Sequence, residues 1–153
     1  MVRQYAGAYQ SGMQGQGDQE PEHVSEAQGS DEQIAKAVKD ILDLSYIALK
    51  NGDLKSAQRT EALEQVVDEL KESLRTKHIL RLQKGECSVE AGFVWSDLLT
   101  NLERVADHCS NISGCVRDSV INTMNIHQNQ RMLRTSGDEF ISELKGLRKE
   151  YKL

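Results

Sequence analysis

Two pairs of carboxylates in this sequence are each spaced four residues apart, Glu64 with Asp68 and Glu103 with Asp107. A helix turns by about 100° per residue, so each pair would lie on one side of a helix, one turn apart. Like charges at this spacing destabilise a helix, and their repetition calls for a chemical reason. Clustered carboxylate oxygens are hard ligands that suit Mg²⁺, Ca²⁺, Mn²⁺ or iron.

The two pairs are symmetric about the Gly85-Glu86 junction, where Asp68 mirrors Glu103 and Glu64 mirrors Asp107. If the chain reverses at this junction, both pairs reach the same level of an antiparallel hairpin. Each pair also borders the apolar stripe of its helix, at about 100° and 140° from the stripe's centre. These angles leave open whether the pairs turn toward each other or apart.

A simpler interpretation competes with a carboxylate cluster. Acidic residues beside an apolar stripe usually form a solvated shoulder that is paired with basic side chains, and Lys71, Arg75 and Arg104 are near in the sequence. No nucleophile elbow, Ser-His-Asp order or Gly-rich phosphate loop accompanies the carboxylates, so we predict no catalytic residue.

Helices must position these carboxylates, because residues 31–153 contain no proline and their apolar residues recur every three or four positions. We expect a first helix capped by Ser30 and ended by Asn51-Gly52-Asp53, and a second helix ended by Lys84-Gly85. Ser88 would cap a third helix. A loop or frayed extension over 121–134 and a short helix capped by Ser136 would follow.

We therefore predict an all-α fold, an antiparallel up-down-up three-helix bundle with a short C-terminal helix beside it. The bundle would span residues 31–153. Residues 1–30 are rich in Gln, Gly, Ser and acids and contain little apolar surface, so we expect them to form a flexible arm.

Composition excludes several classes of function. The formal net charge is −5 and no basic block is long enough to follow a phosphate backbone, so nucleic acid is not an expected partner. No apolar stretch approaches the roughly 18 residues of a membrane span, so we expect no direct membrane insertion and a cytoplasmic location. Cys87, Cys109 and Cys115 match no zinc or disulfide spacing, which predicts reduced thiols.

The segments ALEQVVDEL and LERVADHCSNI, together with the ending EFISELKGLRKEYKL, resemble PhoU-type proteins, regulators of phosphate uptake built from three-helix bundles. The closer resemblance is to the cytoplasmic PhoU-like domain at the C-terminus of bacterial Na⁺/phosphate cotransporters. It covers about residues 31–153 and is strongest over residues 61–112.

This resemblance implies a non-enzymatic regulatory domain whose partner is the membrane domain of a Na⁺/phosphate cotransporter or a phosphate-signalling protein. It also implies a metal site, with Fe, Mn, Mg, Ca and Zn not distinguishable. The residues that match the family's metal-binding motifs are Glu64, Asp68, Glu103 and Asp107. Arg104 and Asn111 match further positions of the motif, where they would position the helix or support the carboxylates.

The chain also departs from the family pattern, because full PhoU proteins contain two three-helix repeats and this sequence has room for one. A lone repeat leaves one flank of the bundle unpaired, which predicts self-association. The chain would be a stand-alone half-domain, or the tail of a longer transporter that holds it at the inner face of the cell membrane. The alternative function is a metal-free helical module for structure or oligomerisation.

Overall fold

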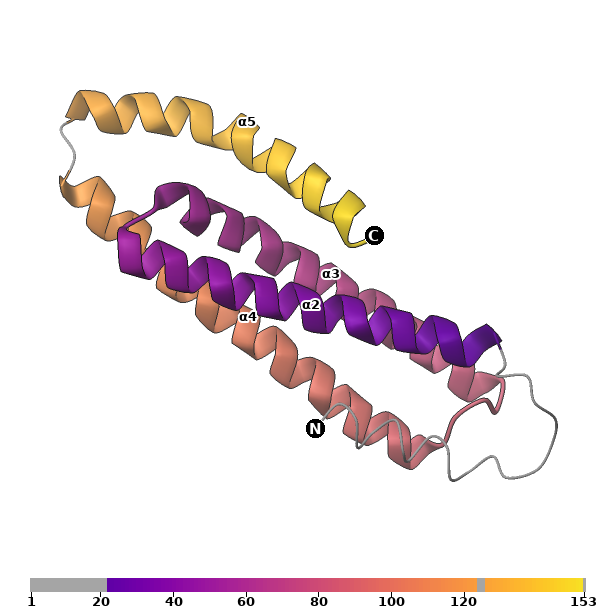
Figure 1. Ribbon diagram of the computed structural model, residues 1–153. Helices are drawn as coiled ribbons and strands as arrows, with labels where there is room; N and C mark the ends of the chain where they lie inside the picture. The colour runs from indigo at the N-terminus through magenta and orange to yellow at the C-terminus, as the bar shows by residue number, and fades with distance from the viewer. Residues whose placement is uncertain (1–21, 124–125, 153) are drawn as a thin grey trace.

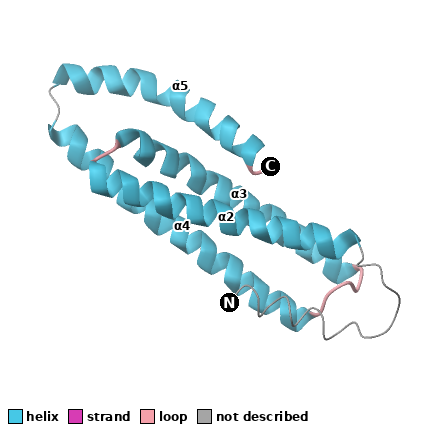
Figure 2. Cartoon of the chain, viewed as in Figure 1, coloured by secondary structure: helices cyan, strands magenta, loops and turns pink. Residues whose placement is uncertain are grey.

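Four α-helices make up the part of the chain that the structure describes. This computed structural model describes the backbone of residues 22–123 and 126–152 and the side chains of residues 32–123 and 137–152. The helices are α2 (Glu22–Asn51), α3 (Leu54–Gln83), α4 (Val89–Thr123) and α5 (Ile126–Glu150). No strand occurs within these ranges (Figure 2), so the predicted all-α fold is confirmed.

The first three helices form the bundle, and each of them contacts the other two. Figure 1 shows them side by side, with α5 set to one side and running along α3. Short turns at residues 52–53 and 84–88 reverse the chain, which gives the predicted up-down-up order. The carboxylates of α3 and α4 therefore lie on neighbouring antiparallel helices.

The core follows the apolar stripes of the three long helices. Leu63, Val66 and Val67 of α3 are almost completely buried, and Ile34 and Ile41 of α2 meet them. Burying such side chains contributes roughly 1.5 to 3 kcal/mol each relative to leaving them exposed. α4 and α5 complete this core with Leu99, Ala106, Cys109, Leu147 and Tyr151.

Both turns have the local chemistry that the sequence indicates. Gly52 and Gly85 have φ values of +63° and +72°, a left-handed conformation that glycine adopts without strain. The Asp53 carboxylate accepts hydrogen bonds from the backbone amides of Lys55 and Ser56 at the start of α3. At the start of α4, the Ser88 hydroxyl accepts one from the Ala91 amide at 3.2 Å, as predicted for a helix cap.

Two helix boundaries differ from the prediction. α2 begins at Glu22, so Ser30 lies inside the helix and does not cap it; residues 1–21 of the predicted arm lie outside the described residues. α5 begins at Ile126 and is 25 residues long, so Ser136 is also internal and the final helix is not short. Both added segments contain good helix formers and no proline, and helix continues through their weak apolar patterns.

The end of the α3–α4 hairpin near Gly85 is closed by a ring stack. The rings of His78 and Trp95 lie 4.8 Å apart between centroids, with 28° between their planes. Gly92 lets the two helices approach here, because a Cβ at this position would come within 2.5 Å of Nε2 of His78. The contact fixes the position of α3 relative to α4 along the bundle axis. It thereby sets the height at which the carboxylates of the two helices lie along that axis.

Helix α5 is attached to the bundle by a small apolar centre with charges around it. Leu147 and Tyr151 are buried and line a groove with Leu63 of α3. The Tyr151 hydroxyl donates a hydrogen bond to Asp40 of α2, and burial together with this bond raises the pKa of Tyr151 to about 12.

Opposite charges surround this apolar centre. They pair across the contact as Lys36 with Glu150, Arg59 with Glu143, and Arg148 with Glu69. The charges at these three pairs are thus complementary, and we call the contact of α5 with α2 and α3 through its described residues the α5 interface.

Candidate functional site

The four predicted carboxylates lie on one face of the bundle, formed by α3 and α4. Glu64 follows the buried Leu63, and Asp68 follows the buried Val67 one turn later. On α4, Asp107 follows the buried Ala106. We call Glu64, Asp68, Glu103 and Asp107 the carboxylate face.

The pKa of Glu64 reports how these charges interact. Partial burial of the Glu64 side chain raises its pKa first, and the charges of Asp68, Asp107 and Glu103 raise it further. Three of these four groups therefore act electrostatically on the fourth, across both helices. The two pairs therefore lie within electrostatic reach of each other across the contact between α3 and α4.

Asp68 experiences the same repulsion with one difference. Its pKa is also raised, by burial and then by the charges of Glu103 and Asp107, while the ammonium of Lys71 works in the opposite direction. Lys71 lies three residues after Asp68 on α3, so both side chains project from the same side of that helix. A lysine therefore belongs to this face together with the carboxylates.

Lys71 crosses from α3 to α4. Its Nζ atom lies 3.1 Å from Oε2 of Glu103, and the two side chains are 21% and 27% exposed. Together they are the least exposed ion pair among the residues whose side chains are described. Glu64 and Asp107 form no ion pair within that same part of the chain. The face thus has one half with a counter-charge and one half without.

The carboxylate face supplies suitable donors for a cation without forming a closed cage. In the described residues, no three His, Cys, Asp or Glu side chains converge closely enough to hold a metal ion. The donor set is nevertheless of the hard oxygen type that divalent cations and iron accept. One of its oxygens faces the ammonium of Lys71.

The remaining predicted positions, Arg104 and Asn111, lie exposed on α4. Neither forms a hydrogen bond or ion pair with another residue of the described segments. The supporting roles expected of them therefore stay predictions.

Two basic residues of this region join α3 to α4, and the sequence names only Lys71 as a possible partner of the acids. Lys71 pairs with Glu103, as the interpretation of a shoulder with basic partners predicts, and Arg117 of α4 pairs with Glu61 of α3, which the sequence does not indicate. The one sequence signal for Lys71 is its position three residues after Asp68. Its choice of Glu103 depends on a long flexible side chain that spans two helices, which periodicity does not reveal.

A scan against protein-family models matches the PhoU domain over residues 32–116, more than half of the 153 residues. The chain belongs to the PhoU domain family. The match covers most of α2, all of α3 and most of α4, and it includes the whole carboxylate face. Helix α5 lies beyond the matched residues. Searches of curated proteins and of solved structures found no match.

Family membership assigns this PhoU domain to the regulation of phosphate homeostasis, in a family that is regulatory and not enzymatic and that works with transporter-associated proteins. In the described segments, no helix has the length and apolar character needed to cross a membrane.

Proposed function

We propose that this PhoU domain regulates phosphate uptake from the cytoplasmic side of the membrane, by contacting the membrane domain of a Na⁺/phosphate cotransporter or a phosphate-signalling protein. The observation that carries the proposal is the family match over residues 32–116, which contains the carboxylate face. The closer resemblance of the sequence to cotransporter domains supports the first of the two partners. A transporter domain would hold the chain at the inner face of the cell membrane.

We further propose that the carboxylate face binds a divalent cation or iron, with Fe, Mn, Mg, Ca and Zn all compatible with oxygen donors. Mutual repulsion supports this, because Glu64 and Asp68 both have raised pKa values beside the other carboxylates. A bound cation would neutralise that repulsion. Because the ligands come from α3 and α4, the ion would also fix the two helices relative to each other.

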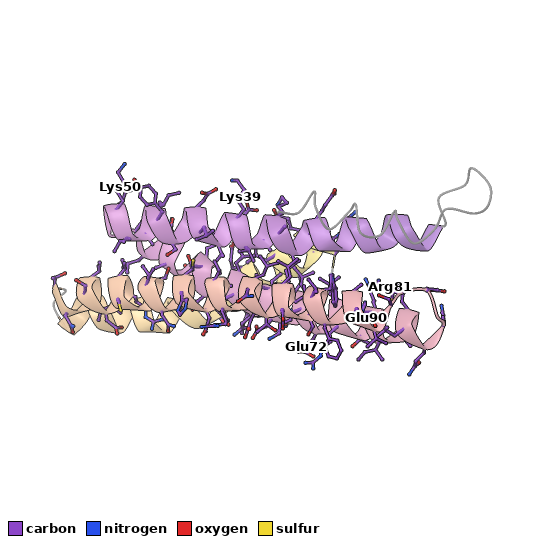
Figure 3. The ribbon with its side chains drawn as sticks, turned by 90° about the horizontal axis from the view of Figure 1, so that it is seen from below. Lys39, Lys50, Glu72, Arg81 and Glu90 are labelled. Atoms are coloured by element: carbon purple, nitrogen blue, oxygen red, sulfur yellow. The ribbon has the colours of Figure 1, made fainter. Side chains whose placement is uncertain are left out.

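Phosphate uptake tests the regulatory proposal directly. Uptake of radiolabelled phosphate would be measured in the native host at low and at high external phosphate, with the chromosomal copy carrying Glu64→Gln and Asp107→Asn. We expect the variant to lose the difference in uptake between the two conditions. The matched control is Lys39→Met, on a part of α2 that points away from the rest of the bundle (Figure 3).

The outcomes separate the parts of this proposal. Unchanged regulation in the double variant would contradict a role for the carboxylate face. If deletion of the whole chain leaves uptake unchanged at both phosphate levels, regulation of uptake itself is contradicted. Cross-linking from exposed positions in intact cells, followed by identification of the partner, would distinguish a cotransporter from a signalling protein.

A specific observation favours oligomerisation as a second candidate. Leu42, Tyr46 and Leu49 recur every three or four residues on α2 and are 47%, 61% and 61% exposed. Such an apolar strip suits a second copy of the chain. Light scattering after size exclusion tests this, since a dimer should become a monomer in Leu42→Gln/Leu49→Gln.

A further inference from the structure

The outer face of α2 carries a row of charged side chains beside the exposed apolar strip that contains Leu42. The row alternates in sign along the helix and consists of four exposed residues, Glu32, Lys39, Asp43 and Lys50. At about 100° per residue, these four positions lie within about 40° of each other on one side of the helix. Figure 3 shows Lys39 and Lys50 on the side of α2 that points away from the rest of the bundle.

The protein itself makes little use of these charges. Lys39 pairs with Asp43 one turn away, but the two side chains are 73% and 64% exposed, and such a pair adds little to stability. Glu32 and Lys50 form no ion pair with another described residue. The Lys50 ammonium lies 5.6 Å from the centroid of the Tyr46 ring, so this charge directly borders the apolar strip. The row is thus available to charges of another molecule.

The order of the charges is self-complementary when a second α2 runs antiparallel to the first. Lys39 mirrors Asp43, and Glu32 mirrors Lys50, both about residue 41. A two-fold axis at this level would place every charge of the row opposite a charge of the other sign in the second copy. It would also bring the two Leu42 side chains together. A parallel second copy would instead set each charge at the level of its identical counterpart, which favours no pairing.

We propose that α2 packs against α2 of a second copy of this chain in an antiparallel two-fold contact centred near residue 41, with Lys39 of each copy facing Asp43 of the other. The inference rests on the oligomerisation proposed above and adds the direction and register of the contact to it. The apolar strip supplies the area to be buried. The charge row selects the partner and its direction, because opposite charges meet in this arrangement.

Sedimentation equilibrium of the full chain at low ionic strength tests the arrangement. By symmetry each substitution alters two contacts, so Lys39→Glu alone or Asp43→Lys alone should weaken the dimer by about tenfold or more. An equimolar mixture of these two single variants should dimerise again, and so should the double variant Lys39→Glu/Asp43→Lys. In both cases opposite charges face each other once more across the two-fold axis.

Two further variants serve as controls. Lys77→Glu makes the same change of charge at an exposed position of α3, toward the opposite end of the bundle, and should leave the dimer unchanged. Lys39→Met removes a charge without creating repulsion, so it should weaken the dimer only a few-fold.

The results distinguish failure of this arrangement from failure of oligomerisation. A wild type that stays monomeric up to millimolar concentrations would overturn both. A dimer that survives both single charge reversals but dissociates in Leu42→Gln/Leu49→Gln would overturn the antiparallel arrangement while oligomerisation through the strip stands. Loss of the dimer in the single variants without recovery in the mixture and in the double variant would also overturn the arrangement, as would equal weakening by Lys77→Glu.

Discussion

The α5 interface and the carboxylate face occupy two sides of α3 and treat charge in opposite ways. At the α5 interface, acidic side chains meet Lys36, Arg59 and Arg148 around a buried apolar centre. On the carboxylate face, four acidic side chains have Lys71 as their one close counter-charge among the described residues. The first pattern is what stability alone favours, and the second is the one that our proposed cation site would explain.

The largest effect that sharpens this comparison should come from the apolar centre of the α5 interface. Leu147 is 2% exposed, and Leu147→Ala is expected to lower the free energy of unfolding by about 2 to 4 kcal/mol. Ile141 on the same helix is 52% exposed, so Ile141→Ala is the control and should change it by less than about 0.5 kcal/mol. Chemical denaturation followed by circular dichroism measures both; equal losses would mean that α5 is not docked through Leu147.

The next effect concerns the close approach of α3 and α4 at Gly92, which sets the relative position of the two carboxylate pairs along the bundle axis. Gly92→Ala would press a methyl group against the buried His78 ring and should cost about 1 to 2 kcal/mol. Gly114 is also in α4, but a Cβ there would meet nothing within 4 Å, so Gly114→Ala should stabilise by about 0.5 to 1 kcal/mol. Thermal melts of the two variants should therefore shift in opposite directions. Two shifts of the same sign would contradict the close approach at Gly92.

A smaller effect distinguishes the two charge patterns by the sign of a change in melting temperature. Glu69→Gln removes a carboxylate paired with Arg148 and should lower the melting temperature at pH 7, whereas Glu64→Gln relieves repulsion and should raise it by a few degrees. The two substitutions are chemically identical and lie on the same helix. If both lower the melting temperature, the carboxylate face is not under repulsion in the absence of metal.

The pH dependence of the Glu64 variant follows from the direction of its pKa. The pKa of folded Glu64 is raised, so the folded state binds this proton more tightly and the wild type loses stability as pH rises through that pKa. The advantage of Glu64→Gln should thus be full near pH 7 and disappear toward pH 4. Melts of both proteins between these pH values, with EDTA present, would measure it. A constant difference would contradict the raised pKa.

The smallest effect is the response to salt. Raising NaCl from about 50 mM to 500 mM shortens the screening length from more than 10 Å to less than 5 Å, which weakens attraction and repulsion between exposed charges alike. The shifts caused by Glu64→Gln and Glu69→Gln should therefore both shrink toward zero. Leu147→Ala should keep its full effect, because its origin is apolar packing. A charge variant that ignores salt would indicate a packing change instead.

Much of the fold was predictable because it depends on local chemistry. Glycines with positive φ at residues 52 and 85 and the Ser88 cap mark the turns, and apolar periodicity marks the three bundle helices. The symmetry of the carboxylates about Gly85 also follows from an antiparallel hairpin with regular rise. The order of residues along the chain is enough to predict these features, because each involves neighbouring residues or a single reversal of the chain.

The features that the sequence does not predict depend on contacts between residues far apart in the chain, or on where a helix begins. Arg148 and Glu69 are 79 positions apart, and no local pattern indicates that α5 would dock on α3 through them. The starts of α2 and α5 were missed because no strong signal separates a weakly amphipathic helix from a loop. The sequence names Lys71 as a partner for the acids but does not indicate that it pairs with Glu103, because a four-carbon side chain can reach several acceptors.

The stack of His78 on Trp95 has a practical consequence for all of these measurements. The sequence contains a single tryptophan, so the indole fluorescence of the whole protein comes from the closed end of the α3–α4 hairpin. Circular dichroism averages over every helix, whereas this emission reports one location. Comparing the two signals during denaturation would show whether the hairpin end opens with the rest of the bundle or before it.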